Sequence, residues 1–168
     1  MPVSILTELK LRRRNRLRRK EVESLASELK ESLGCETFQP LDVVDIGEAG
    51  GNNIIAYHGK TVAIYIDGKP FLTVHGLIMF PATKRYVTVD MGAVKFLANG
   101  ADVMAPGVVD ADPEITAGMA VWVRDQKNLR PLLVGTALMS GPEMKAAKAG
   151  KAVKTVHYVG DKLWNLSA

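Results

Sequence analysis

The stretch VDMGAVKFLANGADVMAPGVV, Val89 to Val109, decides the fold that we expect for the second half of the chain. Asp90 is placed to cap a short helix, because an aspartate side chain accepts hydrogen bonds from the first backbone N–H groups of a helix. Gly100 is placed to end the same helix, because glycine readily adopts the left-handed conformation that closes helices. A strand follows, and Pro106 and Gly107 interrupt it. The stretch therefore predicts a helix that leads directly into a bent strand.

The residues after this stretch continue as short strands. The apolar runs MAVWVRD (119–125) and RPLLVGTALM (130–139) flank the polar segment QKNL, which predicts two paired strands. Ser140 and Glu143 have the spacing of a capping box at the start of a second short helix. The segment KAVKTVHYV (151–159) predicts a last strand. Several short strands with only two brief helices favour a small barrel-like β domain.

The N-terminal third predicts a helix. Apolar residues recur there every three or four positions, which places them on one face of an amphipathic helix. These residues are Val22, Leu25, Leu29 and Leu33, and Gly34 follows as a candidate C-cap. The pattern leaves open whether the basic residues before Val22 extend this helix or form a separate one. In either case we expect a basic N-terminal helix.

Short β segments follow Pro40. The predicted strands are NIIAYHG (53–59), TVAIYID (61–67) and PFLTVHGLI (70–78). Asp67 and Gly68 suit a tight hairpin turn between the second and third of these strands. Pro70 indicates that the third strand either lies at an edge of its sheet or begins late, because proline cannot donate a ladder hydrogen bond.

Positive charge is concentrated near the N-terminus. The segment KLRRRNRLRRK, Lys10 to Lys20, holds eight of the 22 lysines and arginines, which leaves 14 basic against 18 acidic residues elsewhere. Like charges this dense repel one another on a helix, and nearby acids do not offset them. The segment therefore indicates a polyanionic partner, with a solubilising arm as the alternative.

Membrane insertion and secretion have no support in the sequence. The longest uncharged apolar stretch, PFLTVHGLIMFPAT, contains His75 and two prolines and is shorter than the roughly 20 residues of a membrane-spanning helix. The basic start is followed by EVESLASELKESL instead of the apolar core of a signal peptide. We expect a cytoplasmic protein without a membrane partner.

Catalysis and metal binding have equally little support. Cys35 is the only cysteine, and the three histidines are too scattered to give a ligand spacing. No G-x-S-x-G elbow or cysteine–histidine arrangement provides a nucleophile with its base. We therefore expect no enzymatic activity, no metal and no cofactor.

Four strings in the second half resemble a known family. They are VDMGAVKFLANGADVMAPGVV, AGMAVWV, PLLVGTALMS and GKAVKTVHYVGDKLW, in this order, and together they cover about Arg85 to Trp164. This part is similar to the PUA domain, a small RNA-binding pseudobarrel. The whole chain resembles archaeal stand-alone proteins related to the malignant-T-cell-amplified-sequence family, in which an α/β "pre-PUA" module precedes the PUA domain.

The resemblance implies an α+β fold with two modules. We place their boundary within FPATKR, Phe80 to Arg85, so that residues 1–84 form the pre-PUA module with its basic helix and residues 85–164 form the PUA domain. The eukaryotic members of the resembled family are translation factors that act on the small ribosomal subunit and initiator tRNA, usually with a density-regulated partner protein.

Two groups of residues are candidates for RNA contact. Small residues after the predicted helix let the backbone approach 2′-hydroxyls and phosphates, although the same residues also suit a helix end, a turn or core packing. This first group is Gly100, Ala101, Asp102, Val103, Met104, Pro106 and Gly107. The second group is expected to bind phosphates and consists of Arg12, Arg13, Arg14, Arg16, Arg18 and Arg19.

Weaker candidates lie near the C-terminus. A lysine cluster, Lys145, Lys148, Lys151 and Lys154, either flanks the same RNA or forms a plain solvent-exposed face. His157 or Tyr158 can stack on a base, but strand alternation turns one of the two into the core.

The sequence therefore predicts a non-enzymatic RNA-binding protein of translation initiation or ribosome recycling. Its expected partner is structured RNA, either a tRNA acceptor end or rRNA, and not DNA. Two alternatives stay open. In the first alternative, the chain is an accessory RNA-binding subunit of an RNA-modifying enzyme. In the second, it is a module that docks a translation factor.

Overall fold

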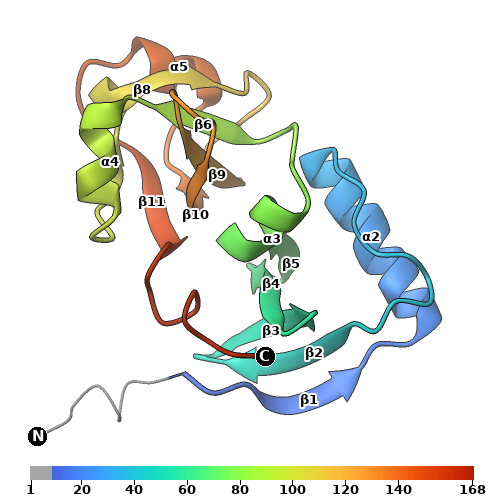
Figure 1. The fold of residues 1–168 in the computed structure, drawn as a ribbon. Coiled ribbons are helices and arrows are strands. Elements are labelled where there is room, and N and C mark those ends of the chain that lie inside the picture. The colour runs from blue at the N-terminus through green and yellow to red at the C-terminus, as the bar shows by residue number, and fades with distance from the viewer. Residues whose placement is uncertain (1–8) are drawn as a thin grey trace, which may run out of the picture.

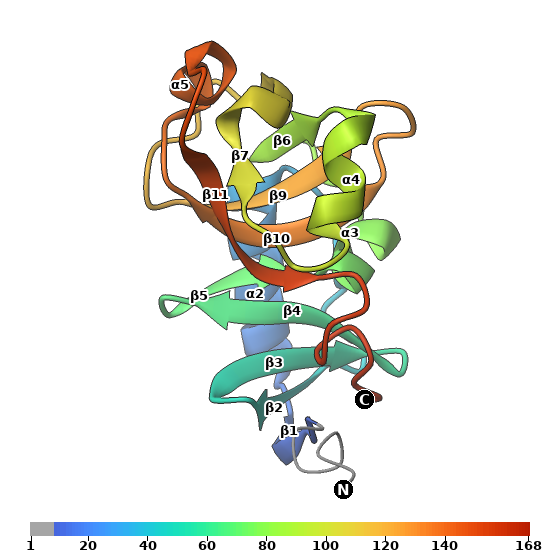
Figure 2. The ribbon, with the colours of Figure 1, turned by 90° about the vertical axis from the view of Figure 1, so that its left-hand side faces the viewer.

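A computed structural model describes residues 9–168 and shows two sheets stacked along an elongated molecule (Figures 1 and 2). The first sheet has the order β1-β2-β3-β4-β5 and the second the order β7-β11-β10-β9-β6-β8. The first sheet comprises β1 (Arg12–Arg16), β2 (Asp45–Ala49), β3 (Asn52–Tyr57), β4 (Lys60–Ile66) and β5 (Lys69–Leu72). The second comprises β6 (Tyr86–Val89), β7 (Val103–Met104), β8 (Val108–Ala111), β9 (Ala120–Asp125), β10 (Pro131–Ala137) and β11 (Lys151–Tyr158).

Helix α2 (Arg19–Leu33) packs its apolar face into the core, as predicted. The predicted C-cap is also confirmed, because Gly34 has a φ of 68° and its N–H donates to the carbonyl of Lys30. The basic segment before α2 is not a helix, however. It forms β1, which pairs antiparallel with β2, and the strand spreads out charges that would crowd one another on a helix.

The hairpin at Asp67 and Gly68 is confirmed, with φ values of 51° and 76° at the two residues. Pro70 lies in β5 at the edge of the sheet, also as predicted. The prediction of one strand over 70–78 is wrong beyond Leu72. Thr73 caps α3 (Val74–Met79) by accepting a hydrogen bond from the N–H of Gly76, so the chain turns into a helix at that point.

The second sheet confirms the predicted barrel-like domain with two short helices. Asp90 caps α4 (Met91–Leu97) by accepting from the N–H of Ala93 at 2.9 Å. Ser140 and Glu143 form the predicted capping box of α5 (Gly141–Ala146). Pro106 and Gly107 lie in η1 (Ala105–Gly107), a single 3-10 turn that separates β7 from β8.

The two sheets share a hydrophobic core. Trp122 of β9 and Val134 of β10 pack in the same buried cluster as the apolar face of α2 and Cys35. The indole N–H of Trp122 also donates to the carbonyl of Lys84, with a distance of 2.8 Å from nitrogen to oxygen. Most other buried apolar side chains of the second sheet form a second core of their own, between Val87 and Val153. Because the first core reaches into both sheets, the boundary at residues 84 and 85 stays a prediction.

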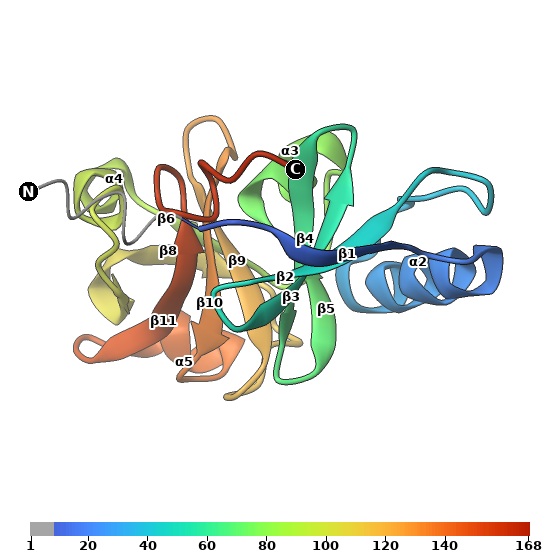
Figure 3. The ribbon, with the colours of Figure 1, turned by 90° about the horizontal axis from the view of Figure 1, so that it is seen from below.

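The C-terminal tail, residues 159–168, runs from the second sheet back to the first (Figures 2 and 3). Leu163 and Leu166 pack against Ala49, Ile54 and Ile64 in a small cluster beneath the tail. The tail thereby covers part of the first sheet with residues that follow the last strand of the second.

Among residues 9–168, no helix is long and apolar enough to span a membrane.

Candidate nucleic-acid interface

A groove of about 600 Å³ lies between α4 and the segment formed by β7 and η1. We call it the α4–β7 groove. Its apolar mouth contains Phe96 and Met104, whose exposed fractions are 59% and 47%. Exposed side chains of this size suit contact with a flat or apolar partner group. The lining residues are Asp90, Gly92, Ala93, Phe96, Leu97, Ala101, Asp102, Val103, Met104, Pro106, Gly107 and Lys151.

The rim of the groove carries an ion pair. Asp102 accepts from the backbone N–H of Thr155 at 2.9 Å, and its other oxygen lies 3.1 Å from Nζ of Lys151. These two partners, the Thr155 N–H first and Lys151 second, lower the pKa of the Asp102 carboxyl below its ordinary value. Both carboxylate oxygens are therefore engaged within the protein. Asp102 serves to hold Lys151 at the rim, whereas the sequence suggested direct contact between Asp102 and a ribose hydroxyl.

The predicted loop residues separate into two groups. Ala101, Met104 and Pro106 are exposed and line the groove together with half-buried Gly107. Val103 is 1% exposed and packs in the second core, so direct contact between its side chain and RNA is excluded.

Gly100 has a structural reason to be glycine. Its φ is +85°, and an added Cβ would lie 2.7 Å from the ring of Tyr158. The backbone conformation and the neighbouring ring both require glycine at this place, whatever the groove binds.

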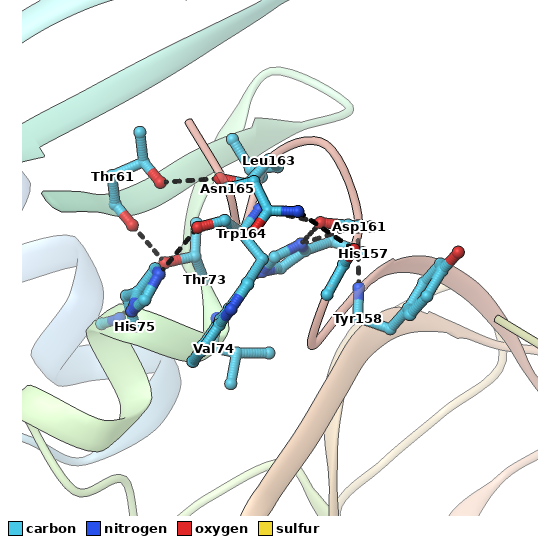
Figure 4. A network of polar contacts seen from close by, with 12 residues as sticks. Thr61, Thr73, Val74, His75, His157, Tyr158, Asp161, Leu163, Trp164 and Asn165 are labelled. Atoms are coloured by element: carbon cyan, nitrogen blue, oxygen red, sulfur yellow. Dashed lines mark hydrogen bonds and ion pairs between the residues drawn. The ribbon is translucent and has the colours of Figure 1, made fainter. Parts of the chain in front are cut away.

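His157 is not available to a base, because its side chain is only 1% exposed. Its Nδ1 lies 2.9 Å from a carboxylate oxygen of Asp161, and its Nε2 accepts from the N–H of Val74 (Figure 4). Nearby, His75 stacks on Trp164 with 3.7 Å between ring centroids. The prediction that His157 contacts RNA is wrong, because the residue joins β11 to α3 and to the tail.

The basic strand is partly neutralised by acidic neighbours. Arg14 and Arg16 both donate to Asp45, a carboxylate that is 7% exposed. Burial alone would raise the pKa of Asp45, but the hydrogen bonds from Arg16 and Arg14 leave it below its ordinary value. These two arginines therefore have a structural role in joining β1 to β2.

The remaining arginines differ in whether they form an ion pair with an acidic residue. Arg13 pairs with Glu48 and Arg19 with Glu23, both at the surface, where such pairs contribute little stability. Within the described residues, Arg12 and Arg18 form no ion pair, and both are exposed. Lys154 is likewise exposed, on β11. The free cations are thus fewer than the sequence suggested.

The chain matches a protein-family model, related sequences and solved structures. The model of the PUA domain matches residues 85–159. An uncharacterised protein of Methanocaldococcus jannaschii is 42% identical over 160 residues, which is 94% of this chain and 98% of that protein. A solved PUA-domain structure from Aeropyrum pernix is 30% identical with a TM-score of 0.76, and it covers 93% of this chain and 90% of the other. This chain belongs to the PUA-domain family.

Other relatives of this PUA protein extend the comparison. A hypothetical protein from Pyrococcus horikoshii has a TM-score of 0.78 and 37% identity, covering 90% of this chain and 97% of that one. Translation machinery-associated protein 20 of Saccharomyces cerevisiae is 33% identical over 94 residues, which is 52% of each chain. The likeness to the yeast protein therefore spans about half the length of either protein. The expected resemblance to PUA proteins is confirmed.

Three residues of this PUA protein were missed as candidates or ranked too low. Phe96 belongs to a helix whose exposed face no sequence pattern marked as functional. Lys151 was only one member of a lysine cluster, and its ion pair with Asp102 is not visible in sequence. Strand alternation indicated that either His157 or Tyr158 faces inward, and the structure leaves Tyr158 as the partly exposed member.

Proposed function

We propose that this PUA-domain protein binds structured RNA, as a non-enzymatic component of translation in the cytoplasm. The observation that carries the proposal is the α4–β7 groove, which combines exposed apolar side chains with one lysine, Lys151, held at the rim by Asp102. The family match and the names of the translation machinery-associated relatives support the same function.

The chemistry of the groove suits the end of an RNA duplex. Phe96 and Met104 offer apolar surface on which a terminal base can stack or pack, and stacking tolerates any base. Small, exposed Ala101 lets a sugar–phosphate backbone come close, and Lys151 at the rim attracts a phosphate. A tRNA acceptor end or an rRNA helix end provides these groups.

Cations outside the groove add affinity without reading sequence. Arg12, Arg18 and Lys154 are exposed and can neutralise phosphates, with the release of counterions from the RNA. We assign Arg13 and Arg19 a smaller share, because each first has to leave an acidic partner.

The proposal is tested by the affinity for an RNA hairpin, measured by fluorescence anisotropy. Replacing Ala101→Glu puts a negative charge at the mouth of the groove. We expect at least about a fivefold weaker affinity, because a charge near a phosphate in water costs roughly 1 kcal/mol. Ala117→Glu makes the same change at an exposed loop position outside the groove and serves as the control. If the wild type does not bind the hairpin, or if both variants bind it equally well, the proposal is wrong.

Docking of a protein partner is a second candidate for the N-terminal half. Leu41 and Val43, in the loop before β2, are 83% and 58% exposed, which favours contact with another protein. We propose the small ribosomal subunit and a density-regulated-type protein as partners in initiation or recycling. Pull-down with and without ribonuclease separates the two candidates, since only protein docking survives digestion of the RNA.

A further inference from the structure

A second groove, of about 840 Å³, lies between the C-terminal tail and the first sheet. We call it the tail groove. One wall is the turn between β2 and β3, with Ala49 and Gly50, and the other wall is the tail from Gly160 to Leu166. Its apolar base includes Ile54 and Ile64. The two walls therefore come from segments that are far apart in the sequence.

The tail groove comes close to the α4–β7 groove near Tyr158, although the two grooves share no lining residue. Tyr158 lines the tail groove, and its ring lies against Gly100, the residue directly before Ala101 of the α4–β7 groove. In Figure 2, α4, β11 and the tail all lie on the face towards the viewer. A ligand that leaves the first groove next to Ala101 thus reaches Tyr158 without crossing to another face.

At its other end, the tail groove opens toward the basic strand. A third hollow of about 540 Å³ is lined by Lys10 and Arg12 on one side and by Gly51 and Asn53 on the other. This hollow shares lining residues with the tail groove. The shared residues are Leu9, Ala49 and Gly50. The tail groove and this third hollow therefore extend without a break from Tyr158 to the start of β1.

The tail groove and the third hollow, which form this path, are lined by three basic and two acidic side chains, so their net charge is positive. Lys162 lines the tail groove, and Lys10 and Arg12 line the third hollow, all with exposed side chains. The two acids along the path are already engaged. Asp161 accepts from His157 and from the N–H groups of Tyr158 and Trp164, and Glu48 pairs with Arg13. A polyanion is the complementary ligand.

The remaining groups along the path suit unpaired nucleotides. Gly51 and Gly160 have open space where a side chain would be, so the backbone there is accessible. The amides of Asn53 and Asn165 can hydrogen-bond base edges, which only unpaired bases expose fully, and the ring of Tyr158 can stack on a base. A single strand needs this combination of cations, amides and an aromatic ring.

We propose that a single-stranded extension of the RNA bound in the α4–β7 groove passes Tyr158, follows the tail groove and ends at Lys10 and Arg12. This inference rests on the proposed function, because the α4–β7 groove must bind the paired part of the same RNA. One RNA molecule then joins the two sheets. The extension raises affinity because its binding becomes intramolecular once the paired part is bound.

The test compares a blunt RNA hairpin with the same hairpin carrying a single-stranded extension, at its 3′ end in one probe and at its 5′ end in another. We expect one of the extended probes to bind wild-type protein more tightly than the blunt one. The double variant Lys10→Gln with Lys162→Gln, at exposed residues to which the proposed function gives no role, should remove this advantage and leave the affinity for the blunt hairpin unchanged. The logarithmic salt slope for the extended probe should become shallower by about 1.4, since two single-strand phosphate contacts are lost.

The control is Lys69→Gln with Lys127→Gln, which removes two exposed lysines outside the three hollows. It should keep the advantage of the extension. If the blunt hairpin binds but neither extension adds affinity, or if the advantage persists in the Lys10 and Lys162 double variant, the inference is wrong and the proposed function stands. If the wild type binds no hairpin at all, the proposed function itself is wrong, and this inference fails with it.

Discussion

The carboxylate of Asp161 fastens the C-terminal tail to the last strand (Figure 4). It accepts hydrogen bonds from the ring of His157 and from the backbone N–H groups of Tyr158 and Trp164, all between 2.8 and 2.9 Å. Burial favours the neutral acid, yet the hydrogen bond from His157 and the two N–H groups together lower the pKa of Asp161 below its ordinary value. The carboxylate is therefore the form that the folded protein needs.

Replacing Asp161→Asn should lower the free energy of unfolding at pH 7 by about 1.5–3 kcal/mol, the usual contribution of hydrogen bonds to a charged group. A carboxyl with a lowered pKa in the folded state stabilises the protein above its unfolded pKa of about 3.9 and stops doing so as the pH falls through the folded value. Wild-type stability should therefore decrease below about pH 4, and the variant should lack this part of the decrease. Urea unfolding at several pH values measures both effects.

Asp67→Asn is the control, because Asp67 is exposed and lies in a turn that asparagine also tolerates. Its stability at pH 7 should equal that of the wild type. Equal stability of Asp161→Asn and Asp67→Asn would contradict a structural role for the tail carboxylate.

For single residues, the sequence predicted which interactions a side chain can make better than it predicted whether the side chain is exposed to solvent. The pattern around 151–159 required that alternate side chains point inward, but it did not say which ones. His157 faces inward because Val74 and Asp161, from two other segments, supply hydrogen-bonding partners for its two nitrogens. Val74 lies 83 residues from His157 in the chain, so this partner leaves no signal in the local pattern.

Among the elements, α3 depends on a close approach to β4. An added Cβ at Gly76 would lie 2.0 Å from the backbone oxygen of Val62, which cannot move without disturbing β4. Gly76→Ala should therefore destabilise the protein by about 1–3 kcal/mol, although alanine favours helix formation. Thermal unfolding followed by circular dichroism measures this change.

Gly92→Ala is the matched substitution in α4, where the residue is exposed and the nearest neighbouring atom is a side-chain oxygen of Asp90 at 3.3 Å. We expect its stability to be unchanged or raised by up to about 1 kcal/mol. A loss at Gly92 as large as that at Gly76 would mean that helix geometry, and not the contact with Val62, controls the outcome.

Elements with local signals were predicted correctly, and those determined by distant partners were not. The caps at Asp90 and Ser140 lie next to the helices that they start, so the sequence alone was sufficient. The strand β1 forms because Asp45, far along the chain, accepts from two of its arginines. The helix α3 was missed because a short apolar run fits a buried strand as well as a buried helix.

At the scale of the whole molecule, the shared core makes the two sheets depend on each other. Trp122 and Val134 belong to the second sheet by sequence but pack in the core of the first. We predict one cooperative unfolding transition for the full chain in calorimetry. A fragment of residues 85–168 should melt at a lower temperature, because it exposes these two side chains and the ring of His157.

A second transition in the full chain, or a fragment as stable as the full chain, would contradict this dependence.

The sequence suggested two consecutive modules. Apolar patterns indicate which residues are buried, but they do not indicate which other residues those side chains pack against. Most of the predicted loop residues between 100 and 107 line the α4–β7 groove, and their contact with RNA stays a prediction. The tail groove was not predicted, because its walls lie far apart in sequence.

Cys35 provides a chemical probe of whether the shared core is closed. It is the only cysteine of the chain, it is buried in the shared core, and burial raises the pKa of its thiol. A maleimide dye added to the native protein therefore meets no accessible thiolate, so a cysteine introduced at a surface position can be labelled selectively. When the core opens, Cys35 becomes reactive, and its rate of modification reports how often α2 separates from the two sheets.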